Sequence, residues 1–91
     1  MFEKNKYKTN YLIMPTINIT FAVKTANSTS NRISVTQNMS EDLYDSLHKS
    51  VYFNNGDAER WIKNNLFSKV AEIGIRDAWE AVSPMITKIS D

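Results

Sequence analysis

The amino-acid sequence predicts an α+β domain, in which an N-terminal antiparallel β-hairpin packs against two or three α-helices. Two runs, residues 16–25 and 32–38, alternate apolar and polar side chains and are joined by a short polar loop. Residues 40–49 begin with a helix-capping serine, and residues 57–84 form the longest helix-like stretch of the chain. Residues 85–89 either form a short C-terminal strand or pack down without one.

The alternation in the two runs predicts which side chains face the core. In the first run the inward positions are Ile17, Ile19, Phe21 and Val23, and the outward positions are Asn18, Thr20, Ala22 and Lys24. In the second run Ile33 and Val35 point inward, whereas Arg32, Ser34 and Thr36 point outward. Because successive side chains of a strand point to opposite faces, each run predicts a half-buried strand. The loop between them, ANSTSN, consists of turn-forming residues.

The first helix is expected to begin after Ser40, whose side chain can accept a first-turn amide hydrogen. The two acidic residues that follow complement the helix dipole. We expect this helix to end near Lys49. Residues 51–53 then form a short strand or a packed connection, and residues 54–56, Asn-Asn-Gly, form a turn.

The longest helix-like stretch, residues 57–84, begins with Asp57 as the expected N-cap and ends at Pro84, which lacks an N–H. Its apolar face changes side near Asn64 and Asn65, which are poor interior helix residues. Either the stretch breaks there into a short and a longer helix, or one helix is buried on opposite sides along its length. We favour the break. In the second half the apolar and small residues are Phe67, Val70, Ala71, Gly74, Ile75, Ala78, Ala81 and Val82.

Three residues of this second half are candidates for an interface. Ala78 belongs to the row of small residues, which permits a close approach of another backbone. That approach is either packing inside the monomer or the seam of a helix–helix homodimer. Ile73 and Trp79 lie outside the centre of the apolar face, and tryptophan is enriched among residues that dominate binding energy.

The composition limits the classes of protein to which this chain can belong. The chain has 91 residues, which is the size of one domain, and we divide it into a flexible basic segment, residues 1–13, and a single α+β domain, residues 14–91. Met14 could also serve as the start. The absence of cysteine excludes disulfides and thiol chemistry, and a single histidine excludes a histidine metal cluster. Without a glycine-rich phosphate loop or a catalytic triad, we expect no enzyme activity, cofactor or metal.

The sequence also bears on location and origin. Neither a signal peptide nor a membrane-spanning apolar run is recognisable, so we expect a cytoplasmic protein that does not enter a membrane. Asn, Lys and Ile are abundant, which is typical of AT-rich genomes such as those of many phages. This composition suggests a phage-type inhibitor or accessory factor in the host cytoplasm.

Residues 32–66 resemble the ribbon-helix-helix family of DNA-binding proteins, the Arc and MetJ type. The resemblance lies in the strand RISVTQ, the helix start SEDLYDSL, the turn NNG, and the residues Trp61, Ile62, Lys63 and Leu66. It implies an intertwined homodimer whose paired strands enter the major groove, with Arg32, Ser34 and Thr36 reading base edges. It also implies that amides of residues 56–58 hold a phosphate.

Two functional hypotheses follow. The first is a small regulatory domain that acts by contact with a protein partner, through the polar hairpin face (Asn18, Thr20, Lys24, Arg32, Ser34 and Thr36) or the region of Ile73 and Trp79. The alternative is a dimeric DNA-binding transcriptional regulator of the ribbon-helix-helix type, for which Lys24 would add a cation to the same face. A plain solvated sheet surface is the third interpretation of the polar face.

Overall fold

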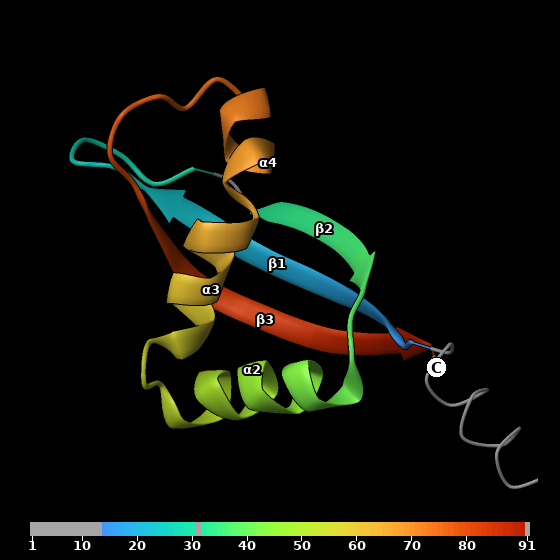
Figure 1. Ribbon diagram of the computed structural model, residues 1–91. Coiled ribbons are helices and arrows are strands. Elements are labelled where there is room, and N and C mark those ends of the chain that lie inside the picture. The colour runs from blue at the N-terminus through green and yellow to red at the C-terminus, as the bar shows by residue number, and fades with distance from the viewer. Residues whose placement is uncertain (1–13, 31, 91) are drawn as a thin grey trace, which may run out of the picture.

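The computed structural model describes residues 14–30 and 32–90, and in them three strands and three helices form an α+β fold (Figure 1). The elements are β1 (Thr16–Lys24), β2 (Ile33–Asn38), α2 (Glu41–Phe53), α3 (Asp57–Asn65), α4 (Phe67–Glu72) and β3 (Glu80–Ser90). The sheet is antiparallel with the order β2-β1-β3, so β1 is its central strand. The α+β class is confirmed. The sheet, however, needs the C-terminal strand as well as the two strands expected from the hairpin. The segment expected to be flexible, residues 1–13, lies outside the described residues.

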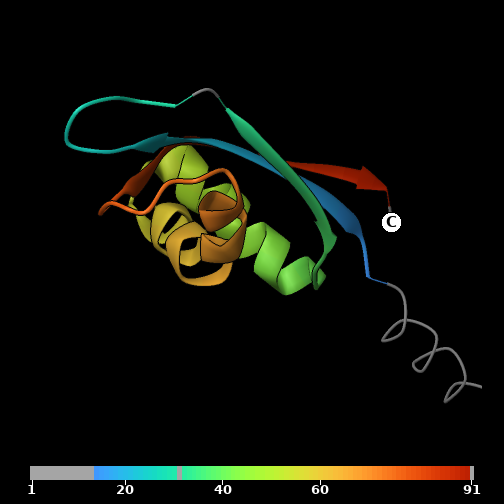
Figure 2. The ribbon, with the colours of Figure 1, turned by 90° about the horizontal axis from the view of Figure 1, so that it is seen from above.

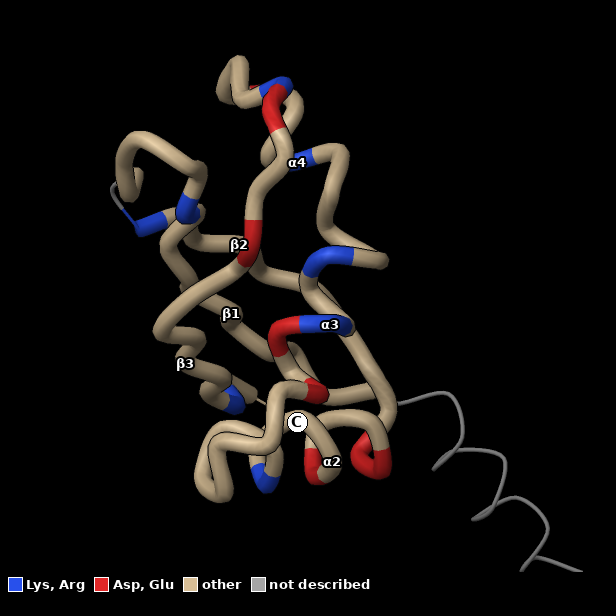
Figure 3. Tube along the Cα trace, turned by 90° about the vertical axis from the view of Figure 1, so that its left-hand side faces the viewer, with Lys and Arg blue, Asp and Glu red and all other residues tan. Residues whose placement is uncertain are grey.

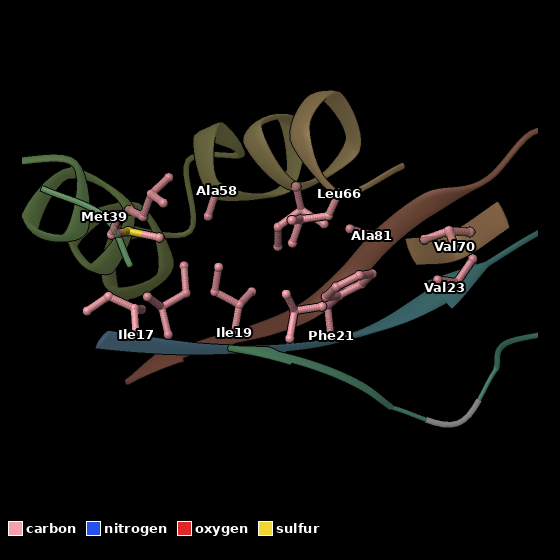
Figure 4. Packing of buried hydrophobic residues seen from close by; sticks show 13 residues of the cluster. Ile17, Ile19, Phe21, Val23, Met39, Ala58, Leu66, Val70 and Ala81 are labelled. Carbon is pink, nitrogen blue, oxygen red and sulfur yellow. The ribbon is translucent and has the colours of Figure 1, made fainter. Parts of the chain in front are cut away.

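The molecule has two layers, because all three described helices lie against the same face of the sheet (Figure 2). The register places Ile19 of β1 opposite Val35 of β2 and Ile86 of β3, so apolar side chains form rows across the sheet. In Figure 4 the β1 side chains point toward the helices, where Ile62 and others are fully buried. The buried cluster comprises Ile17, Ile19, Phe21, Val23, Val35, Met39, Leu47, Ala58, Ile62, Leu66, Val70, Ala81 and Ile86. No helix in the described part of the chain is long and apolar enough to cross a membrane.

The helix α2 begins as the sequence predicts and ends later. Ser40 is its N-cap, and its Oγ accepts a hydrogen bond of 3.1 Å from the amide of Leu43. The expected end near Lys49 and the strand or connection at residues 51–53 were wrong, since α2 continues to Phe53. Asn54 then adopts a left-handed conformation, with φ of 55°, and closes the helix.

The N-terminus of α3 is capped by a residue of the preceding helix. Asp57, the expected N-cap, is the first residue inside the helix, and the N-cap is Gly56. The Oγ of the buried Ser50 in α2 accepts a 2.8 Å hydrogen bond from the amide of Ala58 and donates one of 2.7 Å to Oδ1 of Asn55. Asn55 Oδ1 also accepts a 3.0 Å hydrogen bond from the amide of Asp57. These bonds satisfy the first two amides of α3 and join α2 to α3.

The expected break near Asn64 and Asn65 is confirmed, because α3 ends at Asn65 and α4 begins at Phe67. The expected continuation to Pro84 was wrong, since α4 ends at Glu72. Gly74 has φ of 89°, and its amide donates a 3.0 Å hydrogen bond to the carbonyl of Ala71. Glycine ends helices in this way because it has no Cβ to oppose a left-handed conformation.

The strand β3 replaces the last turns of the expected helix. Pro84, expected to end a helix, instead lies within β3 at a β-bulge. Thr20 pairs with Met85 and Ala22 with Val82, so Phe21 stands opposite two residues, Ser83 and Pro84. A bulge in an edge strand tolerates proline, because no ladder hydrogen bond is required there. Ala78 lies before β3 and is not helical, so the helix expected at this residue was wrong. An interface at Ala78 stays a prediction.

Candidate functional site

The sheet face opposite the helices is uncovered by any described element (Figure 2). The register brings Asn18 beside Thr36 and Thr87, and Thr20 beside Ser34 and Met85. Partners in a ladder share a face, so these side chains lie together on the uncovered side. We call this surface the open face and define it by Asn18, Thr20, Arg32, Ser34, Thr36, Met85 and Thr87.

Side chains of the open face are hydrogen-bonded to one another. Nδ2 of Asn18 donates to Ser34 Oγ at 2.9 Å and to Thr36 Oγ1 at 3.2 Å. Near the end of the same two strands, Nδ2 of Asn38 donates to Thr16 Oγ1 at 3.1 Å. These bonds fix the orientation of the polar side chains before any ligand arrives, although Ser34 and Thr36 themselves remain exposed.

The structure gives Arg32 partners within the fold. Its Nη2 donates to Thr20 Oγ1 at 2.9 Å and to the carbonyl oxygens of Thr20 at 3.2 Å and Ser83 at 2.7 Å. The side chain therefore crosses the sheet from the start of β2 to the bulge of β3. Arg32 shares the open face with Ser34 and Thr36, as expected, but its guanidinium is already used in tying the strands together.

The centre of the open face is nearly uncharged. Residues 16–23 and 33–38 contain no Asp, Glu, Lys or Arg, so the blue and red segments of Figure 3 belong to other parts of the described chain. Arg32 stands directly before β2, and Lys24 is exposed at the end of β1. A nearly neutral surface of hydroxyl and amide groups suits hydrogen bonding to a neutral polar partner better than binding to a polyanion.

The other predicted residues are divided between two hollows at opposite edges of the sheet. A hollow of about 350 Å³ brings together Lys24, Ala78 and Trp79. Nζ of Lys63 lies 5.8 Å from the centroid of the Trp79 ring and contributes to the same hollow. Ile73, in contrast, lines a hollow of about 330 Å³ together with Ser34 and Thr36. Lys24, predicted on the polar hairpin face, thus lies with Trp79, whereas Ile73 lies with Ser34 and Thr36 of that hairpin face. Each hollow therefore combines residues from the two predicted surfaces.

Other exposed groups carried no clear signal in the sequence. Tyr52 and Phe53 are 79% and 67% exposed and form an edge-to-face pair with ring centroids 5.0 Å apart. Met85 on the open face is 57% exposed. A groove of about 540 Å³ separates α3 from β3 and is lined by Glu59 among others. Alternation in residues 85–89 could have indicated Met85, but the groove depends on contacts between distant segments.

Neither metal ligation nor histidine chemistry emerges from the described residues. No group of three or more His, Asp or Glu residues gathers among them in a geometry that could hold a metal ion. His48 is exposed, and its ring lies 5.4 Å from that of Tyr44 on the same helix.

Comparisons of the chain with protein-family models, with curated proteins and with solved structures found no match.

Proposed function

We propose that this chain is a small non-enzymatic regulatory domain that acts by contact with a protein partner through the open face. The observation that carries the proposal is the set of hydrogen bonds from Asn18 to Ser34 and Thr36. Association costs less conformational entropy when the contacting side chains are already held in place. The open face meets this condition, and it is not covered by any described helix.

The chemistry of the open face suggests the kind of partner. Hydroxyl and amide groups of Asn18, Ser34 and Thr36 lie beside the apolar side chain of Met85, which is 57% exposed. Protein–protein interfaces combine polar and apolar area in this way and are depleted in charge at their centre. We propose a partner with a flat, nearly neutral surface, and an inhibitor or accessory factor as the role.

Site-specific crosslinking tests this proposal. A photoreactive benzoylphenylalanine at Thr36, an exposed residue of the open face on β2, should give one discrete crosslinked protein in cells that express the chain. The same residue at Lys49, which is exposed on α2, serves as the control and should not give that product. Identical products from both positions, or none from either, would remove the open face as the binding surface.

A DNA-binding regulator of the ribbon-helix-helix type is the second candidate. It is favoured by the position of β2, which lies at the edge of the sheet, directly before α2 and α3, with Ser34 and Thr36 exposed. Two observations place it second. Two copies joined through β2 would make a sheet of six strands, about 24 Å wide, whereas the major groove is about 12 Å wide. In addition, the amides of Asp57 and Ala58, expected to hold a phosphate, already have partners.

Duplex binding separates the two candidates. The DNA-binding hypothesis requires affinity that falls steeply with salt, because counterions are released from the phosphates. It also requires that the double variant Ser34→Ala, Thr36→Ala bind more weakly. Fluorescence anisotropy with duplex DNA at several salt concentrations measures both effects. For the proposed protein-binding domain we expect no saturable binding in this experiment.

A further inference from the structure

The outer edge of β3 differs along its length in its capacity to pair with another strand. The sheet order places β3 at one edge, so no described strand covers its outer side. Pro84 has no N–H to donate, and the bulge at Ser83 interrupts the regular ladder. Residues 80–82, before the bulge, carry neither of these features. Residues 80–82 therefore form an uninterrupted piece of sheet edge to which another strand can be added.

A groove of about 540 Å³ runs beside this part of β3. One wall is formed by residues 80–83, and the other by Gly56 and by Glu59, Arg60 and Lys63 of α3. Figure 1 shows α3 lying alongside the beginning of β3. A groove between a helix and an unpaired strand edge is the geometry in which an extended peptide adds to a sheet, using its backbone for affinity and its side chains for specificity.

One wall of the groove contains a carboxylate oxygen without a partner. Oε1 of Glu59 is buried and accepts no hydrogen bond from any described residue. The two cations on the same wall have other partners: Arg60 forms an ion pair with Asp57, and Lys63 lies over the Trp79 ring. A buried acceptor without a donor is unfavourable. Since Glu80 on the opposite wall is also a carboxylate, the groove offers a place for a positively charged donor.

We infer that the groove binds an extended peptide segment of a partner protein that carries a lysine or arginine. The peptide backbone pairs with residues 80–82 of β3, and its cationic side chain pairs with the carboxylate of Glu59, whose side chain is partly exposed. We expect a cationic side chain because its charge is opposite to that of Glu59. We expect an extended peptide because its backbone pairs with an edge strand. This site is separate from the open face, since it lies between the layers at the edge of the sheet and not on the uncovered side.

Titration with defined peptides, followed by amide chemical shifts of the intact chain, tests the inference. One pool of heptapeptides has lysine at the central position and Val, Thr, Ser or Ile elsewhere, and a matched pool has glutamate at the centre. The lysine pool should shift the amides of residues 80–82 and of Glu59, and the glutamate pool should bind about tenfold more weakly. Backbone N-methylation of the lysine pool should abolish binding. Shifts located elsewhere, or equal binding of the two pools, would overturn the inference.

Substitution of Glu59 provides an independent readout. Glu59→Gln keeps the size of the side chain and should weaken binding of the lysine pool about tenfold. It should leave the Tm of the free domain unchanged or raise it, because the charge is removed from a group that has one buried oxygen without a donor. Glu72→Gln on α4 is the matched control and should change neither quantity. A lowered Tm with unchanged affinity would assign Glu59 a structural role and overturn the inference, whereas crosslinking from Thr36 would be unaffected.

Discussion

Arg32 Nη2 lies 2.7 Å from the carbonyl oxygen of Ser83, 51 residues further along the chain. Ser83 has a positive φ of 52° and lies at the bulge of β3. The same nitrogen also contacts Thr20 of the central strand. One side chain thus connects all three strands at the point where the β1–β3 register shifts, and it supplies a donor to a carbonyl that the bulge removes from the regular ladder.

We therefore expect Arg32→Ala to lower the free energy of unfolding by about 1–2 kcal/mol, because the exposed guanidinium makes charge-assisted hydrogen bonds to the backbone. Urea denaturation followed by circular dichroism measures this loss. Arg76→Ala, at an exposed position between α4 and β3, is the control and should stay within about 0.5 kcal/mol of the parent. Equal stability of the two variants would mean that the Arg32 contacts contribute nothing. The expected loss also means that reduced binding by Arg32→Ala would not identify a ligand contact.

Removal of the buried hydroxyl of Ser50 should be more damaging. Ser50→Ala leaves the amide of Ala58 without its acceptor and Asn55 Oδ1 without one donor. We expect a loss of about 1–3 kcal/mol in the free energy of unfolding. Ser46→Ala, on the exposed side of the same helix, has the same chemical change and should be nearly neutral. A thermal unfolding midpoint that is the same in both variants would contradict the capping role of Ser50.

Gly74 allows a test of conformational strain alone. A Cβ at this position would meet no atom within 4 Å, but φ is +89°. Gly74→Ala should therefore destabilise the domain by about 1–2 kcal/mol through the backbone. Gly74→Asn should cost less than Gly74→Val, since asparagine tolerates left-handed backbone and β-branched residues do not. Denaturant titration of the three variants gives the order, and a valine variant as stable as the asparagine one would refute this explanation.

The position of Ala78 outside any helix predicts a mild effect of a charge there. Ala78→Glu should leave both the unfolding midpoint and the solution mass unchanged, because Ala78 is exposed. Ala58→Glu places the same side chain at a fully buried position of α3 and should prevent stable folding. Light scattering and thermal unfolding report the two quantities. A change in solution mass in Ala78→Glu alone would restore an interface at this residue.

The elements that could be predicted from sequence are those in which a local pattern reports burial. Alternation placed Ile19 and Phe21 on the covered face of β1, and helical spacing placed Ala58, Ile62 and Leu66 on one buried side of α3. The Ser40 cap was also local, since acceptor and donor lie three residues apart. In each case a few neighbouring residues determine the outcome.

Residues 73–84, which the pattern predicts to be helical, show where local sequence patterns fail. Gly74 fits the spacing of small residues on a helix face, although its left-handed conformation lies just beyond the end of α4. Pro84 concealed β3, because a proline within an apolar run argues against a strand unless the strand is an edge with a bulge. Edge position and bulge both follow from pairing with β1, which lies some sixty residues earlier and leaves no trace in the local sequence. The groove lined by Glu59 could not be predicted for the same reason, because its walls come from α3 and β3, which are brought together only by the fold.

The central strand β1 lies between β2, which soon follows it in the chain, and β3, which is the last described element. During synthesis on the ribosome β2 therefore becomes available early, while the other edge of β1 stays unpaired until the last strand emerges. Contacts between segments so distant in sequence slow folding, since a large loop must close before they form. A nascent chain of this protein thus presents an open sheet edge beside an incomplete core until β3 has been synthesised. Loss of residues 80–90, which constitute β3, would leave it permanently in that state.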